Sequence, residues 1–153
     1  MRQEYLPRMT VPSHPWASVI VPIKDERDNL VILLEGLLTV MSSHATSQTR
    51  PFEIIFVDDG STDGSSEELE RLAAQHSHVR VFHFDRNYGK TCALDAGFTQ
   101  STGDVIIEID GDLQQDSEDI LKLLPYTATY DLVCGWRQQR QDGLVKKMSS
   151  RIA

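Results

Sequence analysis

The feature that most constrains this sequence is an alternation of strand and helix signals that runs from residue 18 to the end of the chain. Short apolar, β-branched runs are followed by polar turns and then by apolar residues at helical spacing. The expected strands are residues 18–23, 52–57, 79–84, 104–109 and 131–134, and the expected helices are residues 30–41, 65–75, 88–100 and 117–126. Residues 42–50 are polar and are expected to form a loop. This alternation predicts an α/β fold with a mostly parallel sheet and helices on both faces.

Length and composition indicate one ordinary globular domain. The 153 residues are 40% hydrophobic and 25% charged, which is enough apolar material for a core. The formal charge of −8 argues against a nucleic-acid partner, because nucleic-acid binding requires a basic face. No run approaches the roughly 18 apolar residues of a membrane span. Residues 1–17 are expected to form a flexible N-terminal arm, and residues 18–153 the domain.

Two residue types receive default interpretations. Cys92 and Cys134 lie in apolar segments and are expected to be buried free thiols, which fits a reducing, cytosolic environment. The five histidines show no metal-ligand spacing, and no role is assigned to them.

The stretch from Gly103 to Gln114 contains the most informative polar cluster. Residues 105–109 are expected to form a buried strand, and Asp110, Asp112 and Gln114 follow at its C-terminal end. Alternate side chains of an extended backbone lie on one side, so three oxygen donors spaced by two residues can converge. Such ligands suit Mg²⁺ or Mn²⁺, and Mg²⁺ is usually held by one or two carboxylates together with substrate phosphates. The pattern predicts a metal that bridges the protein to a diphosphate; the alternative is a simple Asp-Gly-Asp turn.

Four segments, taken in their order and spacing, resemble the motifs of family 2 glycosyltransferases. They are the strand and turn at residues 19–30, the Asp-Asp-Gly-Ser turn within residues 54–63, the Asn-x-Gly-Lys helix start within residues 87–97, and the Asp-x-Asp motif at residues 110–114. The Leu-Gln extension of the last motif, and the segment Gly135-Trp-Arg-x-x-Arg140, resemble the polyprenyl-phosphate branch of the family. That branch includes dolichol-phosphate mannosyltransferases and undecaprenyl-phosphate sugar transferases.

The resemblance implies an A-type glycosyltransferase fold, which is a Rossmann-like nucleotide-sugar-binding domain. It also implies a nucleotide-diphosphate sugar as donor, inversion at the anomeric carbon, and Mg²⁺ or Mn²⁺ as cofactor. In the polyprenyl branch the acceptor is a lipid phosphate. Because that acceptor is already an anion at neutral pH, catalysis would rest on positioning and on charge stabilisation of the leaving diphosphate.

Site residues follow from the matching motif positions. The nucleotide-sugar-binding residues implied by the resemblance are Pro22, Lys24, Glu26, Asp58, Lys90 and Asp110. The implied metal ligands are Asp110, Asp112 and Gln114. Asp112 and Arg137 are the predicted catalytic residues, and Arg137 and Arg140 are predicted to hold the acceptor phosphate, since the planar fork of arginine suits phosphate.

Structural alternatives exist for several of these residues. Glu26 is also a first-turn glutamate that a helix dipole favours. Asp58 is also a turn former. Lys90 and Arg140 are also compatible with solvated surface positions.

The sequence departs from the family pattern at three places. Lys24 stands where an aromatic residue is common, and Asp25 stands where asparagine is common. Ser117 precedes Glu118 where many relatives have proline, and serine is a favourable helix cap. Family members also continue well past the length of this chain, so the domain is expected to be incomplete at its C-terminal end.

These observations favour a glycosyltransferase that moves a sugar from a nucleotide-diphosphate sugar to a dolichyl or undecaprenyl phosphate. Its expected location is the cytoplasmic face of a membrane, with the membrane contact made by further C-terminal sequence or by a partner, or the cytoplasm for this chain alone. The alternatives are a transferase of the same fold that acts on a saccharide or a protein, and an inactive nucleotide-sugar-binding module.

Overall fold

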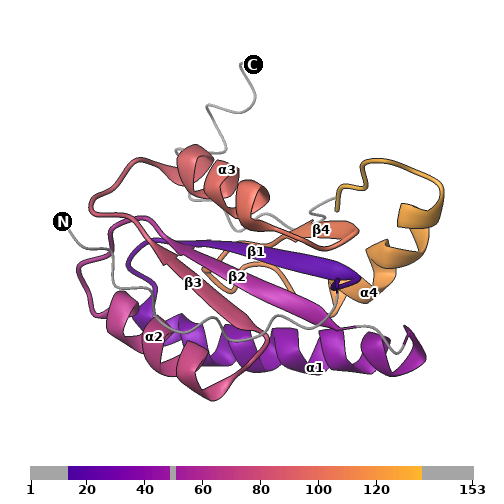
Figure 1. Ribbon diagram of the computed structural model, residues 1–153, viewed down its shortest axis with the longest axis horizontal. Coiled ribbons are helices and arrows are strands. Elements are labelled where there is room, and N and C mark those ends of the chain that lie inside the picture. Colours follow the sequence, from indigo (N-terminus) through magenta and orange to yellow (C-terminus); the bar gives the residue numbers. More distant parts are fainter. Residues whose placement is uncertain (1–13, 49–50, 136–153) are drawn as a thin grey trace, which may run out of the picture.

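The computed structural model of the chain describes residues 14–48 and 51–135, and it contains a parallel four-stranded sheet between two layers of helices (Figure 1). The strands are β1 (Ala17–Ile23), β2 (Phe52–Asp58), β3 (Val79–His83) and β4 (Val105–Glu108). Their order across the sheet is β3-β2-β1-β4, and each neighbouring pair is parallel. The predicted α/β architecture with a parallel sheet is confirmed.

Helices cover both faces of the sheet, as predicted. The helices α1 (Leu30–Gln48) and α2 (Ser65–Gln75) lie on one face, and α3 (Lys90–Gln100) lies on the other (Figure 1). A short α4 (Asp119–Leu123) and two 3-10 turns, η1 (Arg27–Asn29) and η2 (Leu124–Ala128), complete the described elements. Within the described ranges, no helix is both long enough and apolar enough to cross a membrane.

The core forms where the apolar stripe of α1 meets the sheet. The buried residues of that stripe recur at helical spacing, and they are Leu30, Leu33, Leu34, Leu37, Val40 and Met41. On the opposite face, Ala93 of α3 packs against Ile55 and Val57. Gly97 lets α3 approach closely, because a Cβ atom there would lie 2.4 Å from Cγ2 of Ile20. Both helix layers are therefore held by apolar burial.

The path of the chain reverses at β1. From β1 the chain moves outward through β2 to β3, with α1 and α2 as crossovers on one face. It then returns through α3 on the other face, and β4 joins the free side of β1. In open α/β sheets such a reversal leaves a crevice at the carboxyl ends of the two strands. The segments that follow β1 and β4 therefore meet at one place.

Two boundaries near the start of the chain differ from the prediction. Trp16 is buried, its backbone N–H donates to the Pro51 carbonyl oxygen at 2.8 Å, and β1 begins at Ala17. The end of the expected arm is thus part of the domain. The loop expected at residues 42–50 is wrong over residues 42–48, where α1 continues. No glycine or proline interrupts this stretch, and the Ser43 hydroxyl donates to the Val40 carbonyl oxygen within the helix at 2.7 Å.

Other departures concern the edge of the sheet and the end of the described chain. β4 is half-buried rather than buried, because α3 packs over β1 and β2 and leaves Ile106 exposed. Residues 131–134, expected to be a strand, have no regular structure, and Leu132 is 81% exposed. Cys92 and Cys134 are exposed free thiols, contrary to the prediction, because neither lies on a face that packs against the sheet.

A buried carboxylate ties the amino end of the sheet together. Glu53 of β2 is 2% exposed and accepts hydrogen bonds from the Ser18 hydroxyl at 2.7 Å and the Arg80 guanidinium at 2.7 Å. The backbone N–H and the hydroxyl of Thr102 each donate to it at 2.8 Å. Burial alone would raise the pKa of Glu53, but these hydrogen bonds hold that pKa below its ordinary value of 4.5. Glu53 therefore links β1, β2, β3 and the segment after α3.

We expect Glu53→Gln to lower the free energy of unfolding at neutral pH by about 1–3 kcal/mol, because a charge-assisted acceptor of four hydrogen bonds is lost. The folded-state pKa of Glu53 is depressed, so its contribution is present above pH 4.5 and is lost as pH falls through the folded value. The stability difference between wild type and variant should therefore shrink in acid. Urea unfolding at several pH values measures it, with the exposed Glu35→Gln as control; an unchanged difference would contradict the assignment.

Candidate active site

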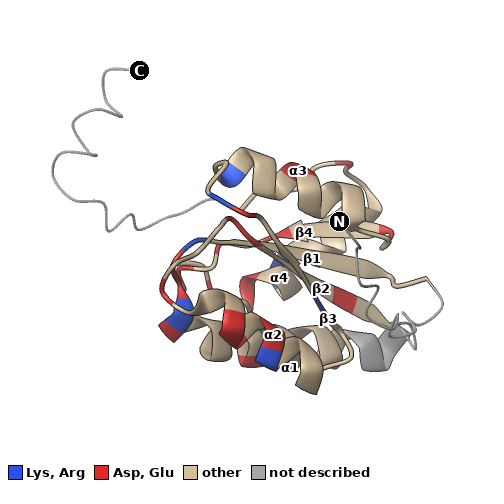
Figure 2. Ribbon diagram, turned by 60° about the vertical axis from the view of Figure 1, so that its left-hand side comes forward, with Lys and Arg blue, Asp and Glu red and all other residues tan. Residues whose placement is uncertain are grey.

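A hollow of about 230 Å³ opens at the carboxyl end of the sheet, where the segments after β1 and β4 meet. The residues that line it are Pro22, Ile23, Lys24, Glu26, Asp59, Lys90, Ala93, Asp110, Gly111 and Asp112. Acidic loop segments gather at this end of the sheet, with a basic segment at the start of α3 above them (Figure 2). Of the predicted site residues, the structure brings together Pro22, Lys24, Glu26, Lys90, Asp110 and Asp112.

Lys90 supplies positive charge among these carboxylates. Its Nζ atom lies 2.5 Å from Oδ1 of Asp110 and 3.3 Å from Oε1 of Glu108. The hydrogen bond to Asp110 raises the pKa of Lys90, so the side chain is a fixed cation at neutral pH. The other oxygen of Asp110 faces the Gln115 amide at 3.4 Å. The first carboxylate of the Asp-x-Asp motif is thus charge-balanced by a residue 20 positions earlier in the chain.

The chemistry of the donor set fits Mg²⁺ or Mn²⁺. Asp110 and Asp112 both border the hollow, and Mg²⁺ commonly takes one or two carboxylates together with substrate phosphates. Residues 14–48 and 51–135 contain no cluster of three or more His, Cys, Asp or Glu side chains that would hold the ion alone.

Gln114, the predicted third metal ligand, was expected to share one side of an extended backbone with Asp110 and Asp112, and the structure does not have that extended backbone. The backbone is not extended after β4: Leu113 has φ +57°, and the Gln114 N–H donates to Oδ1 of Asp112 at 3.1 Å in a tight turn. Gln114 is exposed and is not among the residues that line the hollow. Its role as a metal ligand stays a prediction.

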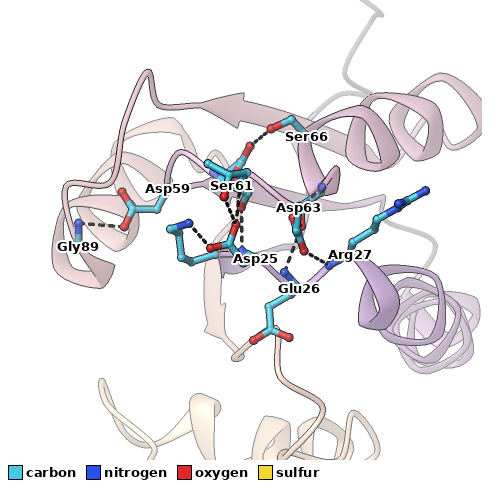
Figure 3. Close-up of polar contacts among 12 residues, drawn as sticks. Asp25, Glu26, Arg27, Asp59, Ser61, Asp63, Ser66 and Gly89 are labelled. Carbon is cyan, nitrogen blue, oxygen red and sulfur yellow. Dashed lines mark hydrogen bonds and ion pairs between the residues drawn. The ribbon is translucent and has the colours of Figure 1, made fainter.

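Hydrogen bonds from backbone N–H groups to side-chain oxygens join the turn after β1 to the turn after β2 (Figure 3). The Asp25 N–H donates to the Ser61 hydroxyl at 2.9 Å, and the Thr62 N–H donates to Oδ1 of Asp25 at 2.7 Å. The Glu26 N–H donates to the Ser65 hydroxyl at 3.1 Å, while the Glu26 carboxylate points away from this turn. The two turns therefore hold one another in place without using the Glu26 carboxylate.

Lys24 and Asp25, two of the three residues that depart from the family pattern, form an ion pair with one another. The Lys24 ammonium group and the hydrogen bond from Thr62 lower the pKa of Asp25. Asp25 has φ +55°, a conformation that Asp and Asn tolerate better than most residues. Aspartate therefore tolerates the backbone conformation of this turn, and the charge that it adds is balanced by Lys24.

Asp58 has contacts other than those predicted for a nucleotide-binding residue. It is 1% exposed and does not line the hollow. Its carboxylate accepts hydrogen bonds from the Ser61 N–H at 2.9 Å, the Ser66 hydroxyl at 2.5 Å and the His83 ring at 2.9 Å. Although burial alone would raise the pKa of Asp58, these hydrogen bonds lower it. These contacts fit the alternative interpretation of Asp58 as a turn former. A contact between Asp58 and the nucleotide stays a prediction.

Asp59 lines the hollow, whereas the sequence analysis chose its neighbour Asp58 as the nucleotide-binding residue of this pair. Its two oxygens accept the Tyr88 N–H at 2.6 Å and the Gly89 N–H at 2.8 Å (Figure 3). Asp59 thereby fixes the loop that leads into α3, and this loop positions Lys90 at the first residue of the helix. Gly60 allows this loop to lie on the turn, because it has φ +67° and a Cβ there would lie 2.4 Å from the Arg86 carbonyl carbon. Strand parity indicated only that neighbouring residues at the end of β2 face opposite sides, and not which of them lines the hollow.

Arg137 and Arg140, the predicted acceptor-phosphate residues, lie outside the described residues.

The sequence matches the family model described as glycosyl transferase family 2 over residues 18–152. The undecaprenyl-phosphate 4-deoxy-4-formamido-L-arabinose transferases of Pectobacterium carotovorum and Yersinia enterocolitica are 40% and 41% identical to it. These matches extend over 136 and 137 residues, which are 88% of this chain in both cases and 40% and 41% of the relatives. The chain therefore spans about two fifths of the length of these relatives.

Solved structures share the fold. The mannosyltransferase PcManGT from Pyrobaculum calidifontis, in complex with GDP-Man and Mn²⁺, matches with a TM-score of 0.56 and 25% identity over 79% of this chain and 34% of that one. S. aureus TarS 1-349, in complex with UDP-GlcNAc, matches with a TM-score of 0.54 and 22% identity over 75% of this chain and 32% of that one, and this likeness concerns the fold alone. The family match, the relatives and the A-type fold agree with the resemblance noted in the motifs, and the chain belongs to glycosyltransferase family 2.

Proposed function

We propose that this chain carries the catalytic domain of an enzyme that transfers a sugar from a nucleotide-diphosphate sugar to a polyprenyl phosphate. The observation that carries the proposal is the hollow between β1 and β4, where Lys90, Asp110 and Asp112 lie together. The choice of acceptor is supported by the relatives, whose names specify undecaprenyl phosphate. Work at the cytoplasmic face of a membrane is part of the same proposal.

The donor diphosphate would lie between the first turn of α3 and the Asp-x-Asp turn. Lys90 can exchange its contact with Asp110 for a phosphate oxygen, because both are anionic acceptors. The amino end of α3, an 11-residue helix, favours negative charge at the same place. Asp110 and Asp112 would hold Mg²⁺ or Mn²⁺, which supplies positive charge against the leaving diphosphate.

The acceptor needs positioning more than activation. A lipid phosphate oxygen is already an anion at neutral pH, so transfer does not require a strong protein base. The reaction is proposed to proceed by in-line attack on the anomeric carbon, with inversion, as the nucleotide diphosphate departs. The negatively charged lipid phosphate must then approach the negatively charged donor diphosphate. Arg137 is the proposed cation that holds the acceptor phosphate, together with Arg140 three positions later in the sequence.

Asp112→Asn should weaken nucleotide-diphosphate binding in the presence of Mn²⁺ by at least about tenfold, because one of the two carboxylates at the metal is neutralised. Binding in the presence of chelator should not change. Asp116→Asn is a matched control, since Asp116 is exposed and does not line the hollow. Calorimetry with UDP and with GDP measures both affinities. Equal affinity of the wild type with and without metal would contradict the metal assignment.

Asp59→Ala should also weaken nucleotide-diphosphate binding, by roughly tenfold, because the loop that carries Lys90 loses two backbone hydrogen bonds. Lys90→Ala should cost a similar amount. If Asp59 acts through Lys90, the double variant will lose clearly less than the sum of the two free-energy changes. Strict additivity, measured by the same calorimetry, would show that Asp59 contributes by a separate route.

Arg137→Ala should reduce transfer to polyprenyl phosphate by about ten- to a hundredfold, since one charge-assisted contact with the acceptor is lost. Nucleotide-sugar affinity should change little. The paired measurement is the transfer rate at subsaturating lipid and nucleotide affinity by calorimetry, in protein that supports transfer. Arg71→Ala serves as the control, because Arg71 pairs with Glu68 on α2 and does not line the hollow. An equal loss in both measurements would remove Arg137 from the acceptor site and would favour a saccharide or protein acceptor.

A further inference from the structure

His83, the last residue of β3, lies between two carboxylates. Its Nδ1 atom is 2.9 Å from Oδ2 of Asp58, and its Nε2 atom is 2.9 Å from Oε1 of Glu70. Asp58 comes from the end of β2 and is its register partner in the sheet, while Glu70 comes from α2. These two are the charged groups that face the ring from the elements packed against it.

The chemistry of imidazole fixes what this arrangement requires. A neutral imidazole has one N–H donor and one lone pair, whereas the imidazolium ion has two donors. An ionised carboxylate has no proton to donate and can only accept hydrogen bonds. The contacts of the ring with Asp58 and with Glu70 are therefore both hydrogen bonds only if the ring is protonated. Asp58 is 1% exposed at its side chain, and its buried charge needs a nearby cation. Burial alone would lower the pKa of His83, but the hydrogen bonds to Asp58 and Glu70 raise it above its ordinary value of 6.5.

The contacts of His83 with Asp58 and Glu70, here called the clamp, are linked by hydrogen bonds to the turn that borders the nucleotide hollow. Oδ1 of Asp58 accepts the Ser61 N–H, and Oδ2 also accepts the Ser66 hydroxyl. The Ser61 hydroxyl accepts the Asp25 N–H of the turn after β1. The next residue, Asp59, holds the loop that leads to Lys90. An unpaired Asp58 would therefore disturb both neighbouring segments of the hollow.

We propose that His83, in its protonated form, is a positioning residue: it clamps Asp58 to α2 and holds residues 58–63 in the arrangement that binds the donor nucleotide. This inference rests on the proposed function, because it assumes that the hollow binds a nucleotide diphosphate. It makes nucleotide affinity depend on pH through a residue that does not line the hollow. His83 has a raised folded-state pKa, so its stabilising contribution is present below pH 6.5 and is lost as pH rises through the folded value.

The test compares two titrations of one protein. The protonation state of His83 is read from long-range ¹H–¹⁵N spectra of the imidazole between roughly pH 5 and pH 9. Affinities for UDP with Mn²⁺ and for GDP with Mn²⁺ are measured by calorimetry over the same range. We expect His83 to be the imidazolium at neutral pH. We also expect the affinity of the better nucleotide to fall by about two- to tenfold as His83 loses its proton, with the same midpoint.

Glu70→Gln removes one carboxylate from the clamp, and its exposed position leaves the core intact, since the Glu70 side chain is 60% exposed. This variant should move both midpoints to lower pH together. Glu67→Gln is the matched control, because it makes the same charge change on the same helix and is not among the partners of the His83 ring, which are Asp58 and Glu70. Both midpoints should stay in place in this variant.

Three results would overturn the proposal. A neutral His83 at neutral pH would contradict the clamp. A Glu70→Gln midpoint that moves in the spectra but not in the affinity curve would contradict the positioning role. If neither nucleotide binds the wild type at any pH, the proposed function is contradicted and the positioning role falls with it, while the spectra still decide whether the clamp exists.

Discussion

The reversal of strand order at β1 is the constraint on which the rest of this structure depends. Because α3 crosses the face opposite to α1 and α2, β4 is placed against the free side of β1. The crossovers of a parallel sheet are right-handed, so this exchange of faces follows once the chain returns past its first strand. The turn after β1 and the turn after β4 then share one crevice, and residues nearly 90 positions apart line it.

Charged side chains in this crevice are held by hydrogen bonds and ion pairs to one another and to the backbone of the protein. Lys90 is paired with Asp110, Lys24 with Asp25, and Asp59 holds the backbone that leads into α3. In the proposed function, such preorganisation would let a diphosphate exchange partners with groups already in place, instead of ordering free side chains. The proposal for His83 adds that the crevice also depends on residues that do not line it, namely Asp58 and His83.

The sequence predicted the parts of the fold that depend on local pattern. The alternation of strands and helices, the parallel sheet and the apolar stripe of α1 follow from periodicity alone. It did not predict that α1 extends over residues 42–48. Many of these residues have low helix propensity, but the segment contains no glycine or proline that would end the helix. The roles of Asp58 and Asp59 were likewise not separable by motif, because they depend on which side of β2 each carboxylate faces and on contacts with β3 and the loop before α3.

The most direct test of this account is to locate a bound metal–nucleotide complex by paramagnetic relaxation. Mn²⁺ with UDP or GDP, added to ¹⁵N-labelled protein, broadens the amide signals of nearby residues. The account predicts loss of signals for residues 22–26, 88–90 and 110–112, with Mg²⁺ as the diamagnetic reference. Signals at the opposite end of the sheet, around Glu53 and Gly103, should remain. Broadening centred on any other part of the chain would contradict the placement of the donor site between β1 and β4.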